Sequence, residues 1–309
     1  MRAFVFPGQG AQALGMGRDL AQNYASAQAV FDEVDEALGE KLSALIWGDD
    51  LDQLTLTQNA QPALMATSMA VMAALKEEGV SIEAASFVAG HSLGEYSALA
   101  AAGTFSLADA ARLLRKRGEA MQAAVPVGEG AMAAVLGLDF DAATQVAQDA
   151  AQGQVCQVAN QNDPSQNVLS GDKAAVERAI DLAKEAGAKR ALLLPVSAPF
   201  HCALMQPAAD VMAEALAQVD MSAPAVPVVS NVLADAVEEP ARIRDLLIAQ
   251  VTGQVRWSAS VEWMAAQGVT EIWEIGAGKA LSGMIRRINR DVTTRALSNP
   301  DDVKAAASA

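Results

Sequence analysis

The segment Gly90-His91-Ser92-Leu93-Gly94 has the residue types and the spacing of a catalytic serine turn. It matches G-x-S-x-G and lies between a strand expected at Ala85–Ala89 and a helix expected at Leu93–Ala102. In such a turn the serine hydroxyl is exposed, while N–H groups and the helix dipole face a developing oxyanion. We therefore predict that Ser92 is a nucleophile; the alternative is an ordinary glycine-rich turn.

A serine nucleophile needs a base, and histidine is the usual one because its pKa lies near neutrality. The chain has only two histidines. His91 is adjacent to Ser92, so its side chain should leave the turn in another direction. His201 is therefore the predicted base, with a structural loop histidine as the alternative.

Arg117 lies where a solvated charge does not belong. On the helix expected at Leu107–Ala124, an apolar stripe recurs at helical spacing and includes Arg117. An unpaired buried cation costs several kcal/mol, so Arg117 needs an anionic partner. That partner is either an internal carboxylate or a substrate carboxylate held in a bidentate fork. The other members of the stripe are Ala110, Leu113, Leu114 and Met121.

Two glycine-rich segments are weaker candidates. Pro7-Gly8-Gln9-Gly10 follows the first strand, and its glycines permit close backbone approach to another group, although a plain turn also explains them. Gly276-Ala277-Gly278-Lys279 lacks the full phosphate-loop spacing, so we interpret it as a structural turn.

Composition excludes several classes of protein. The net charge is −15 and no basic stripe is present, which argues against nucleic-acid binding. The two cysteines suit a reducing compartment, and together with the two histidines they show no metal-ligand spacing. No apolar run approaches the ~20 residues of a membrane span, and the N-terminal apolar stretch is too short for a signal peptide. We expect a cytoplasmic protein without a metal.

These residues must be positioned by strands that alternate with helices along the chain. That alternation predicts an α/β fold with a mostly parallel sheet covered on both faces. Between residues 127 and 195 the order becomes β-α-β-β-α-β, the pattern of a ferredoxin-like unit. We therefore expect a large domain of residues 1–126 and 196–309 and an inserted small domain of residues 127–195. A helix is expected at Pro62–Glu78 with Pro62 in its first position, and the tail Val303–Ala309 is expected to fray.

Several spaced motifs in one order resemble the malonyl-CoA:acyl carrier protein transacylases of fatty acid synthesis. This acyltransferase family also includes the loading domains of polyketide synthases. The resemblance covers the chain from Phe4 to about Leu297, and it implies an α/β-hydrolase-like large domain with a ferredoxin-like small domain. The motifs are Phe6-Pro7-Gly8-Gln9-Gly10, the segment from Gly90 to Tyr96, Arg117-Gly118 and His201.

The resemblance also implies a role for each matching residue. Ser92 is the nucleophile, His201 the base and Arg117 the group that holds the malonyl carboxylate. The backbone N–H groups of Gln9 and Leu93 form the oxyanion hole.

Three further positions match the family, and a fourth, Phe200, is a local difference, because some relatives have a small residue there. The backbone carbonyl of Gln250 orients the histidine, in place of a carboxylate. Asn160 and Gln61 match residues that line the pocket. Phe200 precedes the histidine, a position where phenylalanine goes with malonyl selection among polyketide loading domains and serine with methylmalonyl.

The implied reaction is a ping-pong transfer from malonyl-CoA to the phosphopantetheine thiol of acyl carrier protein through an ester on Ser92. No bound cofactor is required, because the coenzyme A thioester is itself the substrate, and we expect a monomer. An acidic chain meeting an acidic carrier protein needs local basic patches. Two clusters qualify as docking sites, although solvated helix and strand ends explain either one alone: Lys184, Lys189 and Arg190, and Arg286, Arg287 and Arg290.

Three other functions compete with this one. A serine hydrolase, an esterase or thioesterase, would need a further carboxylate after Ser92 and usually an HGGG-type loop. A non-catalytic carrier-protein scaffold would tolerate the loss of Ser92. A cysteine enzyme would use Cys202, whose pKa a helix start could lower, but it has no free histidine partner.

Overall fold

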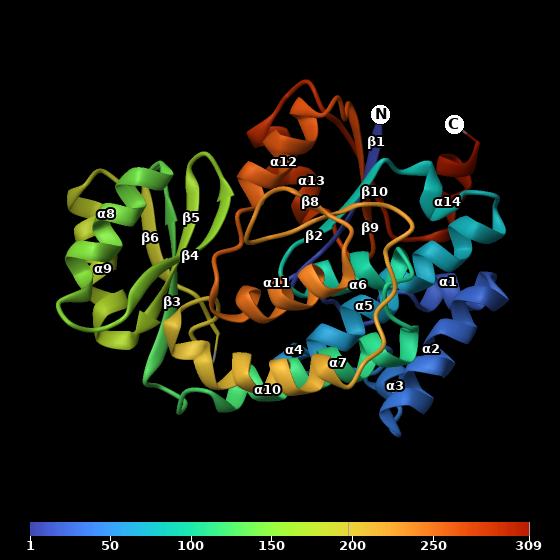
Figure 1. Cartoon of the computed structure of the whole chain (residues 1–309), viewed down its shortest axis with the longest axis horizontal. Helices are drawn as coiled ribbons and strands as arrows, with labels where there is room; N and C mark the ends of the chain where they lie inside the picture. The colour runs from blue at the N-terminus through green and yellow to red at the C-terminus, as the bar shows by residue number, and fades with distance from the viewer. Residues whose placement is uncertain (197, 309) are drawn as a thin grey trace.

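The large sheet is mostly parallel and passes through the centre of the molecule. Figure 1 shows the computed structural model, which describes residues 1–196 and 198–308. Six strands pair in the order β10-β9-β1-β2-β7-β8, and all neighbours are parallel except β7 and β8. The strands are β1 (Arg2–Phe6), β2 (Phe87–Gly90), β7 (Val228–Val229), β8 (Ala236–Val237), β9 (Glu271–Ile275) and β10 (Thr293–Leu297).

Both faces of this sheet are buried, as the alternation along β1 shows. Phe4 and Phe6 pack into one apolar cluster, while Ala3 and Val5 pack into a second one. A parallel sheet covered by helices on both faces requires this continuous apolar pattern. The helices are α1 (Arg18–Asn23), α2 (Ala25–Leu38), α3 (Leu42–Ile46), α4 (Leu51–Thr55), α5 (Thr57–Glu77), α6 (Leu93–Ala101), α7 (Leu107–Ala123), α10 (Gln206–Ala217), α11 (Pro240–Thr252), α12 (Trp257–Ala266), α13 (Ala280–Ile288) and α14 (Pro300–Ala307), with short 3₁₀ turns at Ile82–Ala84 and Ala203–Met205.

The second sheet is antiparallel and carries both of its helices on one face (Figure 1). Its strand order is β4-β5-β3-β6, and the chain order β3-α8-β4-β5-α9-β6 confirms the ferredoxin-like pattern. The domain boundaries at residues 127 and 195 stay a prediction. The elements are β3 (Gly130–Leu136), α8 (Phe140–Ala151), β4 (Cys156–Asp163), β5 (Gln166–Asp172), α9 (Lys173–Glu185) and β6 (Arg190–Leu193).

Two expected helix boundaries were wrong. Helix α5 begins at Thr57, so Pro62 lies inside it, where the ring removes one helical hydrogen bond. The surrounding side chains are almost all buried, and their packing offsets that loss. The expected fraying of the tail was wrong for its described residues, because Asn299 accepts a hydrogen bond from the N–H of Asp302 and caps α14, which reaches Ala307 with Val303 fully buried. Ala309 lies outside the described residues.

Candidate active site

Ser92 lies in a strained turn between β2 and α6. Its φ of 55° and ψ of −111° are unfavourable for a residue with a side chain, and such strain costs about 1–3 kcal/mol. The flanking glycines are required by packing, because a Cβ on Gly90 would lie 1.9 Å from the carbonyl carbon of Gly94, and one on Gly94 would lie 2.2 Å from the Phe6 oxygen. Asn231 supports the turn: its Oδ1 accepts from Ser92 N at 2.8 Å and its Nδ2 donates to the Gly90 carbonyl at 2.6 Å.

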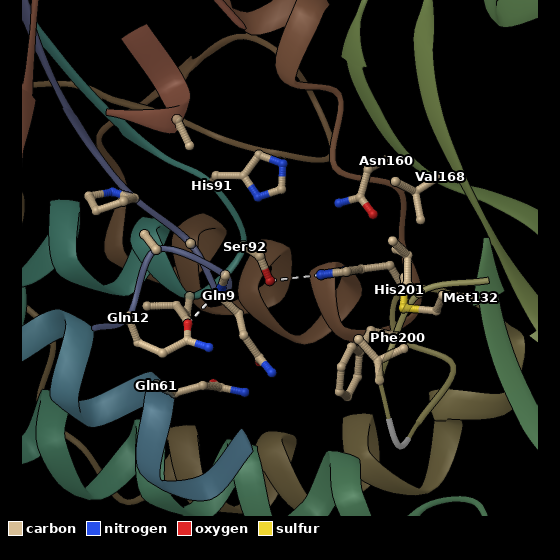
Figure 2. Close-up of a pocket in the computed structure, with 18 of the residues that line it drawn as sticks. Gln9, Gln12, Gln61, His91, Ser92, Met132, Asn160, Val168, Phe200 and His201 are labelled. Carbon is tan, nitrogen blue, oxygen red and sulfur yellow. Dashed lines mark hydrogen bonds between the residues drawn. The ribbon is translucent and has the colours of Figure 1, made fainter. Parts of the chain in front are cut away.

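His201 contacts the serine directly. Its Nε2 lies 2.7 Å from Ser92 Oγ (Figure 2). Its Nδ1 faces the carbonyl oxygens of Gln250 at 2.9 Å and Gly253 at 3.1 Å. A carbonyl only accepts hydrogen bonds, so Nδ1 carries the proton and Nε2 is left to accept the serine proton.

The surroundings of His201 keep its ring neutral. Burial and then the positive charge of Arg117 lower the pKa of His201 to about 3. The imidazole is therefore unprotonated at neutral pH, which is the form that a general base requires.

Arg117 is almost fully buried on α7, with 1% of its surface exposed. Nη1 donates to Gln61 Oε1 at 2.7 Å, and Nη2 donates to Gln250 Oε1 at 2.9 Å and to Ser92 Oγ at 3.1 Å. Among the described residues no carboxylate lies within ion-pair distance of it, so the guanidinium is held by neutral groups next to the serine oxygen. In the described part of the chain, Arg117 therefore makes no direct ion pair with an internal carboxylate.

A pocket of about 440 Å³ brings most of the predicted residues together. Figure 2 shows Ser92 at its centre, with Gln9 and Gln61 from the large domain on one side and Asn160 from β4 on the other. Gln250 does not line the pocket and lies behind Ser92 and Arg117. The predicted residues in the lining are Gln9, Gln61, Ser92, Leu93, Arg117, Asn160, Phe200 and His201.

The two backbone N–H groups predicted to form the oxyanion hole have no hydrogen-bond acceptor among the described residues. Leu93 is the first residue of α6, where a backbone N–H has no partner within the helix. In the described part of the chain, the N–H groups of Gln9 and Leu93 donate no hydrogen bond to protein atoms. The loop that carries Gln9 is fixed in part by a 2.7 Å bond from Gly10 N to Gln12 Oε1.

The predicted docking cations do not form one patch. Arg287 pairs with the buried carboxylate of Asp163 at 2.6 Å, so its charge already has a partner. Asp163 lies on β4, whereas Arg190 begins β6 at the opposite edge of the four-stranded sheet. Lys189 and Arg190 are exposed, and Lys184 pairs with Asp181. Arg286 donates to the Ser282 carbonyl of its own helix.

Sequence reasoning missed two side chains behind the serine. Glu95 is a carboxylate on an otherwise apolar helix, the same signal that identified Arg117, and it accepts a 2.6 Å bond from Gln250 Nε2. Asn231 follows β7, at the carboxyl end of a parallel strand, where functional residues gather. The structure counts against the cysteine-enzyme alternative: burial raises the pKa of Cys202, and the thiol donates to the Pro199 carbonyl.

The described residues lack two features that other classes of protein have. No helix there is long and apolar enough to cross a membrane. Residues 1–196 and 198–308 also hold no group of three or more histidine, cysteine, aspartate or glutamate side chains placed to bind a metal ion.

Comparison with known proteins gives matches along nearly the whole chain. The family model described as "Acyl transferase domain" matches residues 3–293. The malonyl CoA-acyl carrier protein transacylase of Bacillus subtilis is 50% identical over 305 residues, which cover 98% of this chain and 95% of the relative. The crystal structure of an acyl-carrier-protein-S-malonyltransferase from Bartonella henselae is 54% identical, with a TM-score of 0.97 over 99% of this chain and 98% of that one.

A third match includes a partner. It is the malonyl-transacylase of a structure described as a type II PKS acyl-carrier protein in complex with its malonyl-transacylase, 43% identical, with a TM-score of 0.96 over 99% of each chain. Full-length identity of this size and the superposition of the whole fold lead to one conclusion: the chain belongs to the acyltransferase family, together with the malonyl CoA-acyl carrier protein transacylases.

Proposed function

We propose that this protein transfers a malonyl group from malonyl-CoA to the phosphopantetheine thiol of acyl carrier protein, as a step of fatty acid synthesis. The observation that carries the proposal is the contact between Arg117 and Ser92: a buried guanidinium without a carboxylate partner lies 3.1 Å from the candidate nucleophile. An acyl group with a free carboxylate could form its ester with the Ser92 oxygen and pair its carboxylate with the Arg117 guanidinium. The names of the close relatives support the same substrate and the same acceptor.

The first half-reaction acylates Ser92. His201 Nε2 takes the hydroxyl proton while Ser92 Oγ attacks the thioester carbonyl carbon. The N–H groups of Gln9 and Leu93 stabilise the oxyanion that forms there. When the intermediate collapses, the carbon–sulfur bond breaks, and coenzyme A leaves with the proton that His201 held.

The second half-reaction reverses these steps with a different thiol. His201 takes the proton of the phosphopantetheine thiol, and the sulfur attacks the ester carbonyl. Collapse breaks the bond to Ser92 Oγ, which recovers its proton from His201. The same groups serve both halves, which gives ping-pong kinetics.

The pocket wall supports selection of the acyl group. Phe200 is 8% exposed and lines the pocket next to His201, so its ring crowds the space beside the reacting carbonyl. We propose that this ring favours malonyl over the branched methylmalonyl group. Asn160 lines the same pocket from the small domain.

We propose that the acyl carrier protein docks on fewer cations than the sequence indicated. Because Arg287 is committed to Asp163, the better candidates are the exposed Lys189 and Arg190 at the edge of the small domain. The chain segment after β6 leads directly into the pocket lining at Leu194. A basic patch there would meet an acidic partner near the entrance.

Product analysis distinguishes a transferase from a serine hydrolase. The wild-type protein is mixed with malonyl-CoA, with and without phosphopantetheinylated acyl carrier protein, and malonyl carrier protein and free malonate are measured over time. We expect acyl transfer to the thiol to be far faster than release of malonate. Malonate released as fast as malonyl carrier protein would establish the hydrolase instead. The environment of His201 favours the transferase. A serine hydrolase would need a carboxylate beside the histidine, whereas Nδ1 of His201 faces two backbone carbonyls.

Replacing Arg117 by alanine should reduce malonyl transfer by about 10- to 150-fold, the value of a charge-assisted hydrogen bond of ~1.5–3 kcal/mol. Transfer of an acetyl group, which has no carboxylate, should decrease much less. Arg117→Lys should also fail, because an ammonium cannot form the fork that contacts Gln61 and Gln250. Steady-state kinetics with malonyl-CoA and acetyl-CoA measure the difference; equal losses for both would assign Arg117 a structural role.

A further inference from the structure

A second buried charge lies behind the active site and takes no part in the mechanism above. Glu95 is on α6, is 3% exposed and does not line the pocket. Its Oε2 accepts hydrogen bonds from Gln250 Nε2 at 2.6 Å and from Asn231 N at 3.2 Å. A buried carboxylate is costly unless a cation compensates it.

The amide of Gln250 connects this carboxylate to Arg117. Its Nε2 donates to Glu95 while its Oε1 accepts from Arg117 Nη2 at 2.9 Å. The backbone carbonyl of the same residue accepts from His201 Nδ1. One fully buried glutamine therefore bridges a carboxylate, a guanidinium and the candidate base.

Burial lowers the pKa of Arg117, and the charge of Glu95 is among the groups that oppose this by raising it. The groups around Glu95 are the cation Arg117 on α7, the phenol of Tyr96 on its own helix, the backbone N–H of Asn231, and the neutral side chains of Gln250 and Ser230. In the substrate-free protein, Arg117 and Glu95 are thus a buried pair of opposite charges, separated by one amide.

We propose that Glu95 is the resident counter-charge of Arg117, and that it takes up a proton from solvent when the carboxylate of a malonyl group occupies the guanidinium. The inference rests on the proposed function, because it needs a malonyl ester on Ser92. The proton comes from water, and no other bond is made or broken. Glu95 is in this sense a positioning residue that acts through Gln250 and Arg117.

Charge balance gives the direction of the effect. Two carboxylates cannot both stay ionised in a buried site that holds one guanidinium, because like charges disfavour each other's ionised forms. Burial raises the pKa of Glu95 to about 7 even before a second anion arrives, while Gln250, Asn231 and Arg117 oppose the rise. The Ser230 hydroxyl, near this carboxyl and otherwise unpartnered in the described structure, can accept a hydrogen bond from the protonated carboxyl.

The consequence is a pH dependence that only the malonyl group produces. With malonyl bound, the pKa of Glu95 lies above its substrate-free value of about 7, so malonylation takes up a proton at pH values between the two. The equilibrium for malonylation therefore weakens as the pH rises through this interval, by up to about tenfold per pH unit. An acetyl group brings no anion, so Glu95 keeps its charge and this dependence is absent.

The test measures acyl occupancy of Ser92 by intact mass. The protein is equilibrated with equal concentrations of malonyl-CoA and acetyl-CoA at pH 6 to 9, and the ratio of malonyl to acetyl adduct is recorded. The ionisation of the released coenzyme A thiol cancels in this ratio. We expect the wild-type ratio to fall above pH 7 and the ratio in Glu95→Gln to be flat, because glutamine keeps both acceptor bonds without the charge.

A matched control is Glu274→Gln. Glu274 is also fully buried, but it caps α13 by accepting from the N–H groups of Leu281 at 3.0 Å and Ser282 at 2.7 Å. This variant should retain the wild-type slope. A wild-type ratio that does not change with pH, or an unchanged slope in Glu95→Gln, would overturn the proposal.

A second measurement needs no variant. At pH 8 in weak buffer with an indicator dye, malonylation of the wild-type protein should take up more protons per Ser92 acylated than acetylation does, with an excess of up to one. Equal proton balance for the two acyl groups would contradict the inference. Failure of the proposed function has a different signature, since no malonyl adduct would then form on the wild-type protein at any pH.

Discussion

Ser92→Ala should abolish malonyl labelling of the protein while the fold is kept. Alanine removes Oγ and with it the only atom that can form the ester, but it keeps the backbone N–H that bonds Asn231. Arg117 loses one acceptor and retains Gln61 and Gln250. Intact mass after mixing with malonyl-CoA measures the adduct, and thermal unfolding measures the fold.

Ser97→Ala is the matched control for this prediction. Ser97 lies on α6, is fully buried, and its hydroxyl has no hydrogen-bond partner among the described residues. Removal of an unpartnered buried hydroxyl should be close to neutral. The control should therefore label like the wild type. A malonyl adduct that persists in Ser92→Ala would place the nucleophile elsewhere.

His201→Ala should slow acylation of Ser92 by about two to four orders of magnitude, the usual contribution of a general base. The Ser92 hydroxyl then has no group at 2.7 Å to take its proton. Rapid mixing with malonyl-CoA, followed by acid quenching and intact mass, gives the rate of this single step.

The pH profile adds a second readout. His201 should stay neutral throughout the range well above its pKa of about 3, so the wild-type rate should show no histidine titration near pH 6.5. Without the base, the residual rate in His201→Ala should rise with pH, as hydroxide takes over the proton transfer. Identical profiles for wild type and variant would show that His201 is not the base.

His91 provides the matched comparison, since it is the other histidine of the chain. Its Nε2 lies 2.9 Å from Asn162 Oδ1, and its ring contacts Trp257. The side chain thus leaves the serine turn in another direction, as expected from the sequence. His91→Gln should reduce the acylation rate far less than His201→Ala does.

The orientation of His201 by carbonyl groups has a chemical consequence. In a Ser-His-Asp triad a carboxylate stabilises the imidazolium that forms during the reaction. Here Nδ1 donates to neutral oxygens of Gln250 and Gly253, while Arg117 disfavours a positive ring. The imidazolium that forms must therefore be stabilised without an adjacent carboxylate from the protein.

Much of this protein could be predicted from local sequence. The Gly90–Gly94 motif specified a strained turn because only glycine allows the approach distances found at its two ends. The position of Arg117 on an apolar stripe predicted its burial, since the helical period places every third or fourth residue on one face. The β-α-β-β-α-β order predicted the small sheet, because local hydrophobic periodicity distinguishes strands from helices.

Other features depended on contacts between distant segments. Gln250 and Glu95 are 155 positions apart and meet only because the fold brings the end of α11 close to the beginning of α6. The pairing of Arg287 with Asp163 likewise required α13 to lie against β4, and it removed a cation that the sequence presented as free. Helix α5 kept Pro62 inside because burial of its neighbours outweighed one lost hydrogen bond.

The sequence by itself thus indicated which residues could do chemistry: Ser92 and Arg117 from residue type and local pattern, and His201 because it is one of only two histidines and is not adjacent to Ser92. The tertiary structure decided how their charges and protons are balanced, through Asn231, Gln250 and Glu95. The physical reason is range. Turn strain and helical periodicity act over a few neighbouring residues, whereas desolvation and charge pairing depend on whatever the completed fold buries beside a group.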